Sequence, residues 1–188
     1  MTRIIAGSAR GRRLGVPPVG TRPTSDRVRE ALFSSIESEL ASAGRVWSQV
    51  VVLDLFAGSG ALGLEAMSRG AARAVLVEKS RASAKVASDN VGVIGQSEVE
   101  VLVRDAWQLA AMAPPEPPAD LCFADPPYQW TSADVQSLLG GLAVAGWLAP
   151  AATVVVERPA KDAVSPLPWA DSRRRPYGDT ALWYGRVP

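Results

Sequence analysis

The feature that most constrains this chain is a repeated pattern between residues 50 and 157, in which short apolar, β-branched runs alternate with segments of helical periodicity. Such alternation is typical of a parallel sheet whose strands are connected by crossover helices. The predicted strands are Val50–Phe56, Ala74–Glu78, Val99–Arg104, Leu121–Ala124 and Thr153–Glu157. The predicted helices are Ala61–Ser68, Arg81–Val91, Trp107–Met112 and Ala133–Val144. With 188 residues, the chain is long enough for one α/β core and too short for two.

Different elements flank this repeat. A helix is expected to begin near Ser25, because Ser25 can cap it and apolar residues recur at helical spacing after it. Beyond Pro159, the runs Ser172–Tyr177 and Ala181–Arg186 are joined by Gly178-Asp179, a typical hairpin turn. The prediction is therefore an α/β fold with a mostly parallel sheet of seven strands, helices on both faces and an antiparallel C-terminal hairpin at one edge.

Four successive predicted strands end at or directly before a carboxylate, namely Asp54, Glu78, Asp105 and Asp125. Their separations of 24, 27 and 20 residues each correspond to about one strand and helix unit. In a doubly wound sheet the four side chains are expected to meet at the carboxyl edge, where such folds bind ligands. A single acidic residue at a strand end is often only solvated, but four in register favour a shared site.

A glycine-rich segment, Gly58–Gly63, matches the dinucleotide fingerprint G-x-G-x-x-G, with Glu78 where a ribose ligand is expected. Taken alone, this fingerprint suggests an NAD-dependent oxidoreductase. The acidic residues at the same edge make the site a poor host for a pyrophosphate, whereas a cationic nucleoside without phosphate, such as S-adenosylmethionine, suits it. The glycines would then let the backbone approach the ligand closely.

A second motif, Asp125-Pro126-Pro127-Tyr128, follows the apolar run Leu121–Ala124. Two prolines fix the backbone and remove two N–H donors, so the aspartate and nearby carbonyls are presented as acceptors on a rigid turn. Tyr128 adds a flat ring on which a flipped-out base can stack. These groups suit transfer to an exocyclic amine, which must be held with its lone pair facing the donor. The alternative is a proline turn that only caps a strand.

The composition excludes several chemistries. The chain has no histidine and one cysteine, Cys122, which rules out a histidine triad, a zinc cluster and an internal disulfide. Cys122 lies in an apolar run and is expected to be an inert core thiol, and no metal site is predicted. No apolar run is long enough to span a membrane, and the first residues lack an apolar signal region. We therefore expect a cytoplasmic protein without a membrane partner.

Basic residues are concentrated at the start of the chain, although its net charge is only +1. The first 30 residues hold seven arginines against Asp26 and Glu30. Glycine and proline in residues 1–24 favour an extended arm or a loose hairpin over a helix. We expect either a surface that contacts a polyanion or a solvated basic tail. The run Arg173–Arg175 could extend that surface or could protect an exposed strand edge.

Together these segments resemble a known family. The motif at 125–128 is similar to that of amino-group methyltransferases that use S-adenosylmethionine, and Asp54–Gly63 resembles their cofactor loop. Arg3–Leu14 and Thr21–Phe33 are similar to the bacterial 16S rRNA guanine-N(2)-methyltransferases of the RsmD type. The resemblance runs from residue 3 to the strand around Tyr184, so it covers nearly the whole chain.

The resemblance implies a Rossmann-like methyltransferase fold, with residues 1–24 as a basic arm for RNA contact and residues 25–188 as the methyltransferase domain. It implies methylation of the 2-amino group of a 16S rRNA guanine, of the guanine-966 type. The substrate would be the 30S subunit or an assembly intermediate, and the enzyme a monomer. The alternatives are amino methylation of DNA adenine or cytosine, the NAD-dependent oxidoreductase and a non-catalytic RNA-binding protein.

Residue roles also follow from the resemblance. Glu78 would accept both ribose hydroxyls, Asp105 and the Ala106 backbone would read adenine, and Arg22 would contact the cofactor carboxylate or a phosphate. The implied cofactor-binding set is Asp54, Phe56, Gly58, Gly60, Glu78, Lys79, Asp105, Ala106, Arg22 and Thr24. The implied catalytic set is Asp125, Pro126, Pro127 and Tyr128, and the RNA-binding set is Arg3, Arg10, Arg12, Arg13 and Arg27.

The implied mechanism follows from the guanine amine, whose lone pair is delocalised into the ring. Asp125 and the Pro126 carbonyl would hold the amine and stabilise the positive charge that develops as its nitrogen attacks the methyl group. Tyr128 would stack on or beside the base. No covalent enzyme intermediate is needed.

Overall fold

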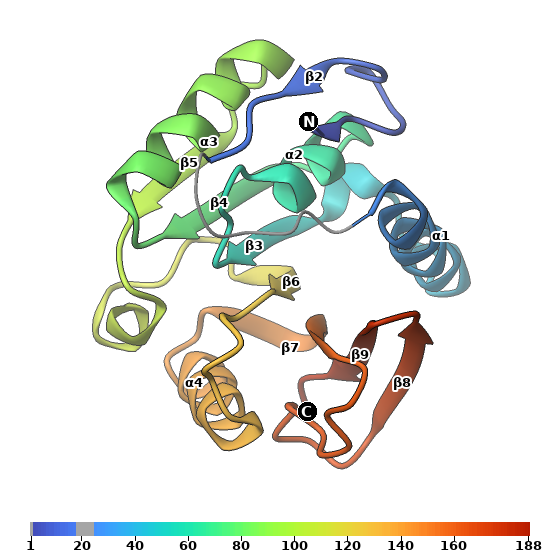
Figure 1. Cartoon of the computed structure of the whole chain (residues 1–188), viewed down its shortest axis with the longest axis vertical. Coiled ribbons are helices and arrows are strands. Elements are labelled where there is room, and N and C mark those ends of the chain that lie inside the picture. Colours follow the sequence, from blue (N-terminus) through green and yellow to red (C-terminus); the bar gives the residue numbers. More distant parts are fainter. Residues whose placement is uncertain (1, 18–24) are drawn as a thin grey trace.

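A seven-stranded sheet forms the centre of the computed structural model, which describes residues 2–17 and 25–188 (Figure 1). The strand order is β5-β4-β3-β6-β7-β9-β8. Strands β3 to β7 run parallel, and β9 pairs antiparallel with both β7 and β8. The strands are β3 (Val51–Leu55), β4 (Arg73–Glu78), β5 (Val99–Val103), β6 (Ala119–Ala124), β7 (Leu148–Pro159), β8 (Ser172–Tyr177) and β9 (Thr180–Arg186). The predicted fold class, including its C-terminal hairpin, is confirmed.

The helices lie on both faces of this sheet. They are α1 (Asp26–Ser42), α2 (Ala61–Ser68), α3 (Arg81–Ile94), α4 (Ser132–Val144) and the short 3-10 helices η1 (Trp47–Gln49) and η2 (Ala106–Ala111). Ser25 caps α1 as predicted, since its hydroxyl accepts a hydrogen bond from the Val28 amide. The helix predicted at Trp107–Met112 is present at Ala106–Ala111, but it is a 3-10 helix, which Asp105 caps.

Among the predicted strands, the one at 153–157 differs most from the structure. Thr153–Glu157 holds the β-branched residues, but β7 begins at Leu148, which pairs with Ala119 of β6 before an irregularity in register. The pairing with β9 then extends β7 to Pro159. Partners on both sides therefore lengthen the strand beyond its own β-branched run.

Alternate strand residues pack into two hydrophobic clusters, one on each face of the sheet. Val52 and Phe123 face α1, α2 and α3, where Phe33 of α1 packs 5.7 Å from the Phe123 ring centroid. Leu53 and Cys122 face η2 and α4. Burial raises the pKa of the Cys122 thiol, which fits the inert core thiol that the sequence predicts. Both faces are thus covered near the carboxyl edge of β3 and β6.

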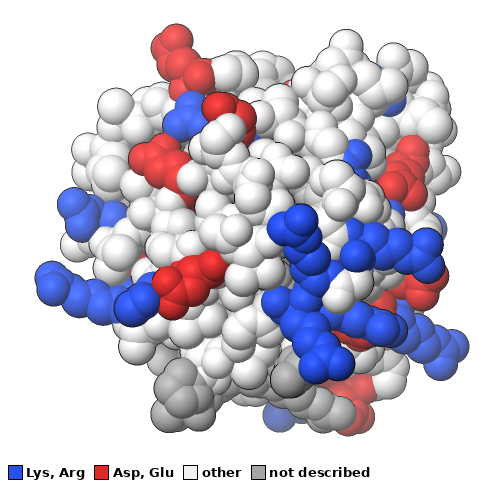
Figure 2. Space-filling model, turned by 90° about the horizontal axis from the view of Figure 1, so that it is seen from above, with Lys and Arg blue, Asp and Glu red and all other residues white. Residues whose placement is uncertain are grey.

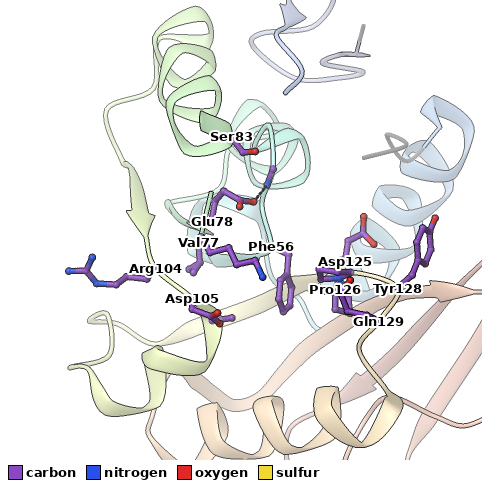
Figure 3. Close-up of a pocket in the computed structure, with 14 residues that line it drawn as sticks. Phe56, Val77, Glu78, Ser83, Arg104, Asp105, Asp125, Pro126, Tyr128 and Gln129 are labelled. Carbon is purple, nitrogen blue, oxygen red and sulfur yellow. Dashed lines mark hydrogen bonds between the residues drawn. The ribbon is translucent and has the colours of Figure 1, made fainter. Parts of the chain in front are cut away.

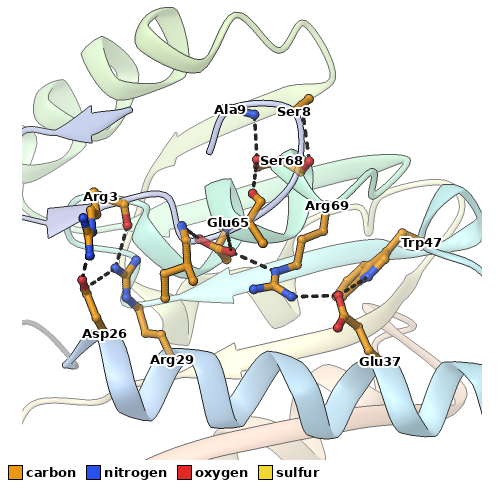
Figure 4. Close-up of polar contacts among 12 residues, drawn as sticks. Arg3, Ser8, Ala9, Asp26, Arg29, Glu37, Trp47, Glu65, Ser68 and Arg69 are labelled. Atoms are coloured by element: carbon orange, nitrogen blue, oxygen red, sulfur yellow. Dashed lines mark hydrogen bonds and ion pairs between the residues drawn. The ribbon is translucent and has the colours of Figure 1, made fainter. Parts of the chain in front are cut away.

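The predicted arm forms a docked hairpin over residues 2–17. Strands β1 (Thr2–Arg3) and β2 (Arg13–Leu14) pair antiparallel, and Ile4 and Leu14 are buried in the cluster beneath α1 to α3. The Glu65 carboxylate of α2 accepts hydrogen bonds from the Ile5 and Ala6 amides, at 2.7 and 3.0 Å (Figure 4). The interpretation as a solvated tail is therefore wrong for residues 2–17. The boundary at residue 24 stays a prediction.

Candidate active site

A cavity of about 300 Å³ lies at the carboxyl edge of the parallel strands (Figure 3). Predicted site residues that line it are Phe56, Gly58, Glu78, Lys79, Asp105, Ala106, Asp125, Pro126, Pro127 and Tyr128. Val77, Ser83, Arg104 and Gln129 line it as well and were not predicted. Figure 3 shows Phe56 between the Glu78 and Asp105 side of the cavity and the Asp125 and Tyr128 side. The predicted cofactor and amine motifs therefore share one cavity.

Two predicted residues lie behind this lining, and two lie outside the described residues. Asp54 is only 3% exposed, and Gly60 is buried under Leu76, so neither lines the cavity. Arg22 and Thr24 fall in the part of the chain that the structure does not describe. Direct contact of these four residues with a cofactor stays a prediction.

The glycine loop after β3 has a backbone that few side chains tolerate. Phe56, Gly58 and Gly60 have φ angles of 60°, 55° and 77°, and the positive φ of a phenylalanine is a strained conformation of the kind found at functional sites. The Gly58 amide donates to the Glu78 carboxylate at 2.9 Å. A β-carbon on Gly63 would lie 2.3 Å from Leu76, so this glycine allows α2 to pack on β4.

The hydrogen bonds of the glycine loop indicate whether the dinucleotide fingerprint can bind a phosphate. In a dinucleotide site the glycine turn and the N-terminus of its helix receive a pyrophosphate. Here the Gly58 and Gly63 amides are already bonded to the carboxylates of Glu78 and Asp54. Two acidic side chains thus occupy donors of the turn that would otherwise face a phosphate, which favours a ligand without phosphate.

Asp54 carries the buried carboxylate of the site. Its Oδ2 accepts from the Gly63 amide at 2.9 Å. Burial raises the pKa of Asp54 to about 7; the Gly63 hydrogen bond opposes this shift, and the negative charge of Glu78 adds to it. The site therefore holds an acidic group whose charge is costly near neutral pH.

Asp125 lies on the other side of the cavity. It is exposed at the mouth, yet the surrounding protein raises its pKa by limiting solvation. The carboxylates of Glu157 and Asp54 raise that pKa further, and the Arg158 guanidinium opposes them. Pro126 is buried and lines the cavity, and Tyr128 is 78% exposed at the rim. An acceptor and an exposed flat ring thus lie side by side, as the motif predicts.

Trp130, which its place two residues after Tyr128 makes the tryptophan expected near the base, belongs to an aromatic cluster with Trp107 and with Phe56 of the cavity lining. Trp107 stacks on Trp130 with ring centroids 5.1 Å apart, and Phe56 meets Trp130 edge-on at 5.0 Å. The Trp130 amide donates to the Pro127 carbonyl at 2.9 Å, and Arg158 donates to the Trp130 carbonyl at 2.6 Å. Arg158 is buried at the end of β7, and an arginine two residues after the apolar run Val154–Val156 is a sequence signal that could have indicated this support.

The predicted RNA-binding arginines are exposed but not equivalent. Arg3 pairs with Asp26 at 3.3 Å, and Arg12 donates to the Val93 carbonyl. Arg10, Arg13 and Arg27 are exposed, and Figure 2 shows basic side chains gathered on the face that carries the N-terminal hairpin.

One arginine of the basic segment has a structural role. Arg29 is 1% exposed and donates to Asp26 and to the Arg3 carbonyl at 2.8 and 2.7 Å (Figure 4). It therefore does not contribute to the basic surface, so the count of seven arginines overstates the charge available to a polyanion. Arg173 also has local partners, with Glu39 at 2.8 Å and the Tyr184 ring centroid at 4.9 Å.

The described residues contain no group of three or more His, Cys, Asp and Glu side chains that could hold a metal ion. No helix in the described part of the chain is long and apolar enough to cross a membrane.

Comparison with known proteins gives one family. The model of the family described as "Conserved hypothetical protein 95" matches residues 2–186. "Ribosomal RNA small subunit methyltransferase D" of Escherichia coli K12 is 36% identical over 182 residues, which are 95% of this chain and 86% of that relative. The solved structure of yhhF from Escherichia coli is 37% identical, covers 99% of this chain and 98% of its own, and superposes with a TM-score of 0.81.

A more distant structure shares the fold. An RNA methyltransferase from Salinibacter ruber, solved with S-adenosyl-L-homocysteine, superposes with a TM-score of 0.64 at 23% identity. It covers 89% of this chain and 94% of its own. At that identity the likeness concerns the fold alone, and it agrees with the methyltransferase fold that the sequence predicts.

Proposed function

The chain belongs to the family described as "Conserved hypothetical protein 95", which is the RsmD-type family, and we propose that it methylates the 2-amino group of a guanine in 16S rRNA. Its general activity is that of an rRNA methyltransferase that uses S-adenosylmethionine. The proposed substrate is the 30S subunit or an assembly intermediate, and the proposed state of the enzyme is a monomer.

One observation carries this proposal: the strand-end carboxylates Glu78 and Asp105 and the turn Asp125-Pro126-Pro127-Tyr128 line the same cavity. The lining fits a nucleoside, since Glu78 can accept hydrogen bonds from a ribose diol, and Phe56, Val77 and Ala106 offer apolar surface to a flat base. Bound there, S-adenosylmethionine supplies an electrophilic methyl group on a positively charged sulfur.

The chain's own residues would prepare the amine. Asp125 and the Pro126 carbonyl accept hydrogen bonds from the guanine NH₂, which orients its nitrogen towards the methyl group. Tyr128 stacks on the base, as its exposure at the rim allows. Positive charge develops on the nitrogen during transfer, and the Asp125 carboxylate stabilises it. The Asp125 carboxylate can then accept the proton that the nitrogen loses.

The test is methyl transfer from labelled S-adenosylmethionine to 30S subunits that lack the modification, with duplex DNA as the competing substrate. Mass mapping of the labelled nucleotide should give N(2)-methylguanine in 16S rRNA. Asp125→Asn should lower the rate by at least about a hundredfold, in the range for loss of a transition-state acceptor. Asp89→Asn changes an exposed carboxylate on α3 and serves as the control. Label in DNA adenine or cytosine would refute the proposal.

A further inference from the structure

Asn90 connects the N-terminal hairpin to the glycine loop of the active site. It lies on α3 and is 2% exposed. Its Oδ1 accepts from the Gly15 amide at 2.7 Å, and its Nδ2 donates to the Gly15 carbonyl at 3.0 Å. The same Nδ2 donates to the Ser59 carbonyl at 2.9 Å. One buried side chain therefore holds the residue that follows β2 and the middle of the loop at the same time.

The chemistry of these contacts requires an amide. A primary amide offers two N–H donors and an acceptor oxygen, and all three are used here. An aspartate could accept from Gly15, but it would place a carboxylate against two carbonyl oxygens. An alanine would leave the two carbonyls and the Gly15 amide without this partner, at contacts that are partly buried.

The rest of the hairpin is held by contacts that do not involve the loop. Ser68 Oγ accepts from the Ala9 amide at 2.9 Å and donates to the Ala6 carbonyl at 2.6 Å (Figure 4). A β-carbon on Gly7 would lie 1.8 Å from the Ser68 carbonyl oxygen, which shows how closely the hairpin approaches α2. The first part of the hairpin is thus docked on α2, and within residues 2–17 the contact of Gly15 with Asn90 is the one that also reaches the loop.

Ser59 is a sensitive position for such a contact. It lies between Gly58, which lines the cavity, and Gly60, and both glycines have positive φ angles. Glycines can adopt several backbone conformations at little cost, so an external hydrogen bond to the peptide between them selects one of these conformations. The Asn90 contact thereby favours the loop conformation in which the Gly58 amide meets Glu78.

We propose that Asn90 is a positioning residue through which RNA bound by the hairpin and S-adenosylmethionine bound at the glycine loop strengthen each other's binding. This inference rests on the proposed function. RNA that orders the hairpin near Gly15 would hold Asn90 and so the loop, and a cofactor that orders the loop would act on the hairpin through the same amide. Coupling between two binding sites is reciprocal, so both affinities must change by the same factor.

The first experiment measures the affinity for labelled S-adenosylhomocysteine with and without saturating unmethylated 30S subunits. The wild-type protein should bind it at least threefold more tightly in the presence of subunits. Asn90→Ala should bind it about fivefold more weakly without subunits, as expected for the loss of one hydrogen bond, and should show no effect of subunits. Asn90→Asp should behave like Asn90→Ala. Ser68→Ala weakens hairpin docking away from the loop and should stay within twofold of wild type in cofactor affinity.

A second measurement needs no variant. Hydrogen exchange of the wild-type protein should show slower exchange of the Gly15 amide when S-adenosylhomocysteine binds, because Asn90 Oδ1 is its acceptor. The Ala9 amide, bonded to Ser68, should exchange at an unchanged rate. Unchanged exchange at Gly15, or a folded Asn90→Ala with wild-type affinity and coupling, would overturn this inference alone. Failure of the wild-type protein to bind S-adenosylhomocysteine would overturn the proposed function and this inference with it.

Discussion

Replacing Asp54 by asparagine should remove a pH-dependent loss of stability. Asp54 is 3% exposed, and burial raises its pKa from 3.8 to about 7. The unfolded chain loses this proton near pH 4 and the folded chain near pH 7, so between these values the folded state binds more protons. The free energy of unfolding therefore falls as pH rises through this range, by about 1.4 kcal/mol per pH unit. Over the full range the ionised Asp54 costs about 4 kcal/mol.

Urea unfolding of wild type and Asp54→Asn from pH 5 to pH 8 measures the contribution of Asp54 to the free energy of unfolding. The asparagine keeps an oxygen that can accept from the Gly63 amide, so the variant removes the charge and retains this hydrogen bond. The free energy of unfolding of the variant should rise by about 2.5 kcal/mol relative to that of wild type between pH 5 and pH 8, and this difference should level off above pH 7. Asp89→Asn, at a side chain that is 63% exposed, should differ from wild type by less than about 0.5 kcal/mol across the same range.

Parallel pH profiles for wild type and Asp54→Asn would refute the reasoning, because they would mean that water or a counter-charge solvates Asp54 in the folded protein. If the profiles diverge as expected, the natural chain keeps a charge that weakens its own fold. Such a charge is expected where it serves a positively charged ligand. Asp54→Asn should then be more stable at pH 8 and bind S-adenosylmethionine more weakly.

Three further predictions concern other parts of the site. Glu78→Gln should weaken S-adenosylhomocysteine binding about 10- to 100-fold in calorimetry, because hydrogen bonds to a charged group are lost. Glu100→Gln, which changes an exposed carboxylate on β5, is the control. If Glu78→Gln binds as tightly as wild type, Glu78 is not part of the site. Tyr128→Ala should raise the KM for RNA about 5- to 100-fold without changing cofactor affinity, and Tyr128→Phe should retain stacking. A wild-type KM for Tyr128→Ala would show that Tyr128 does not stack on the base. Arg10→Ala with Arg13→Ala should flatten the plot of log K for RNA against log salt by about 1.5, whereas parallel lines would show that neither contacts a phosphate.

The sheet was predictable from the sequence because its strands carry their own signal. The apolar runs at β3, β4 and β6 are buried on both faces, so most of their residues are apolar and the run itself marks the strand. The glycine loop was also predictable as a motif, but the reasons why its positions must be glycine were only partly predictable. Gly63 is required because α2 packs against Leu76, a contact between residues far apart in the sequence.

Polar residues of the N-terminal half show where sequence reasoning stops. Arg29 and Glu65 look like ordinary surface charges on two helices, yet both are buried and bonded to the backbone of the hairpin. Helical periodicity places a residue on one face of its helix, but it does not say which distant backbone amide covers that face. The stacking of Trp107 on Trp130 was hidden for the same reason, since the 3-10 helix η2 and the turn after β6 bring the rings together.

Asp54 and Asp125, whose ionisation the protein disfavours, lead to a last prediction about the charge of the ligand. Both have a raised pKa near neutral pH, and a positive charge in the cavity would lower each of them. Binding of a sulfonium at pH 7 should therefore release protons. S-adenosylhomocysteine lacks this charge, so it should release fewer protons than S-adenosylmethionine at the same site. Calorimetry in buffers of different ionisation enthalpy measures that difference, which Asp54→Asn should reduce. Equal proton release by both ligands in the wild-type protein would show that neither carboxylate responds to the sulfonium charge.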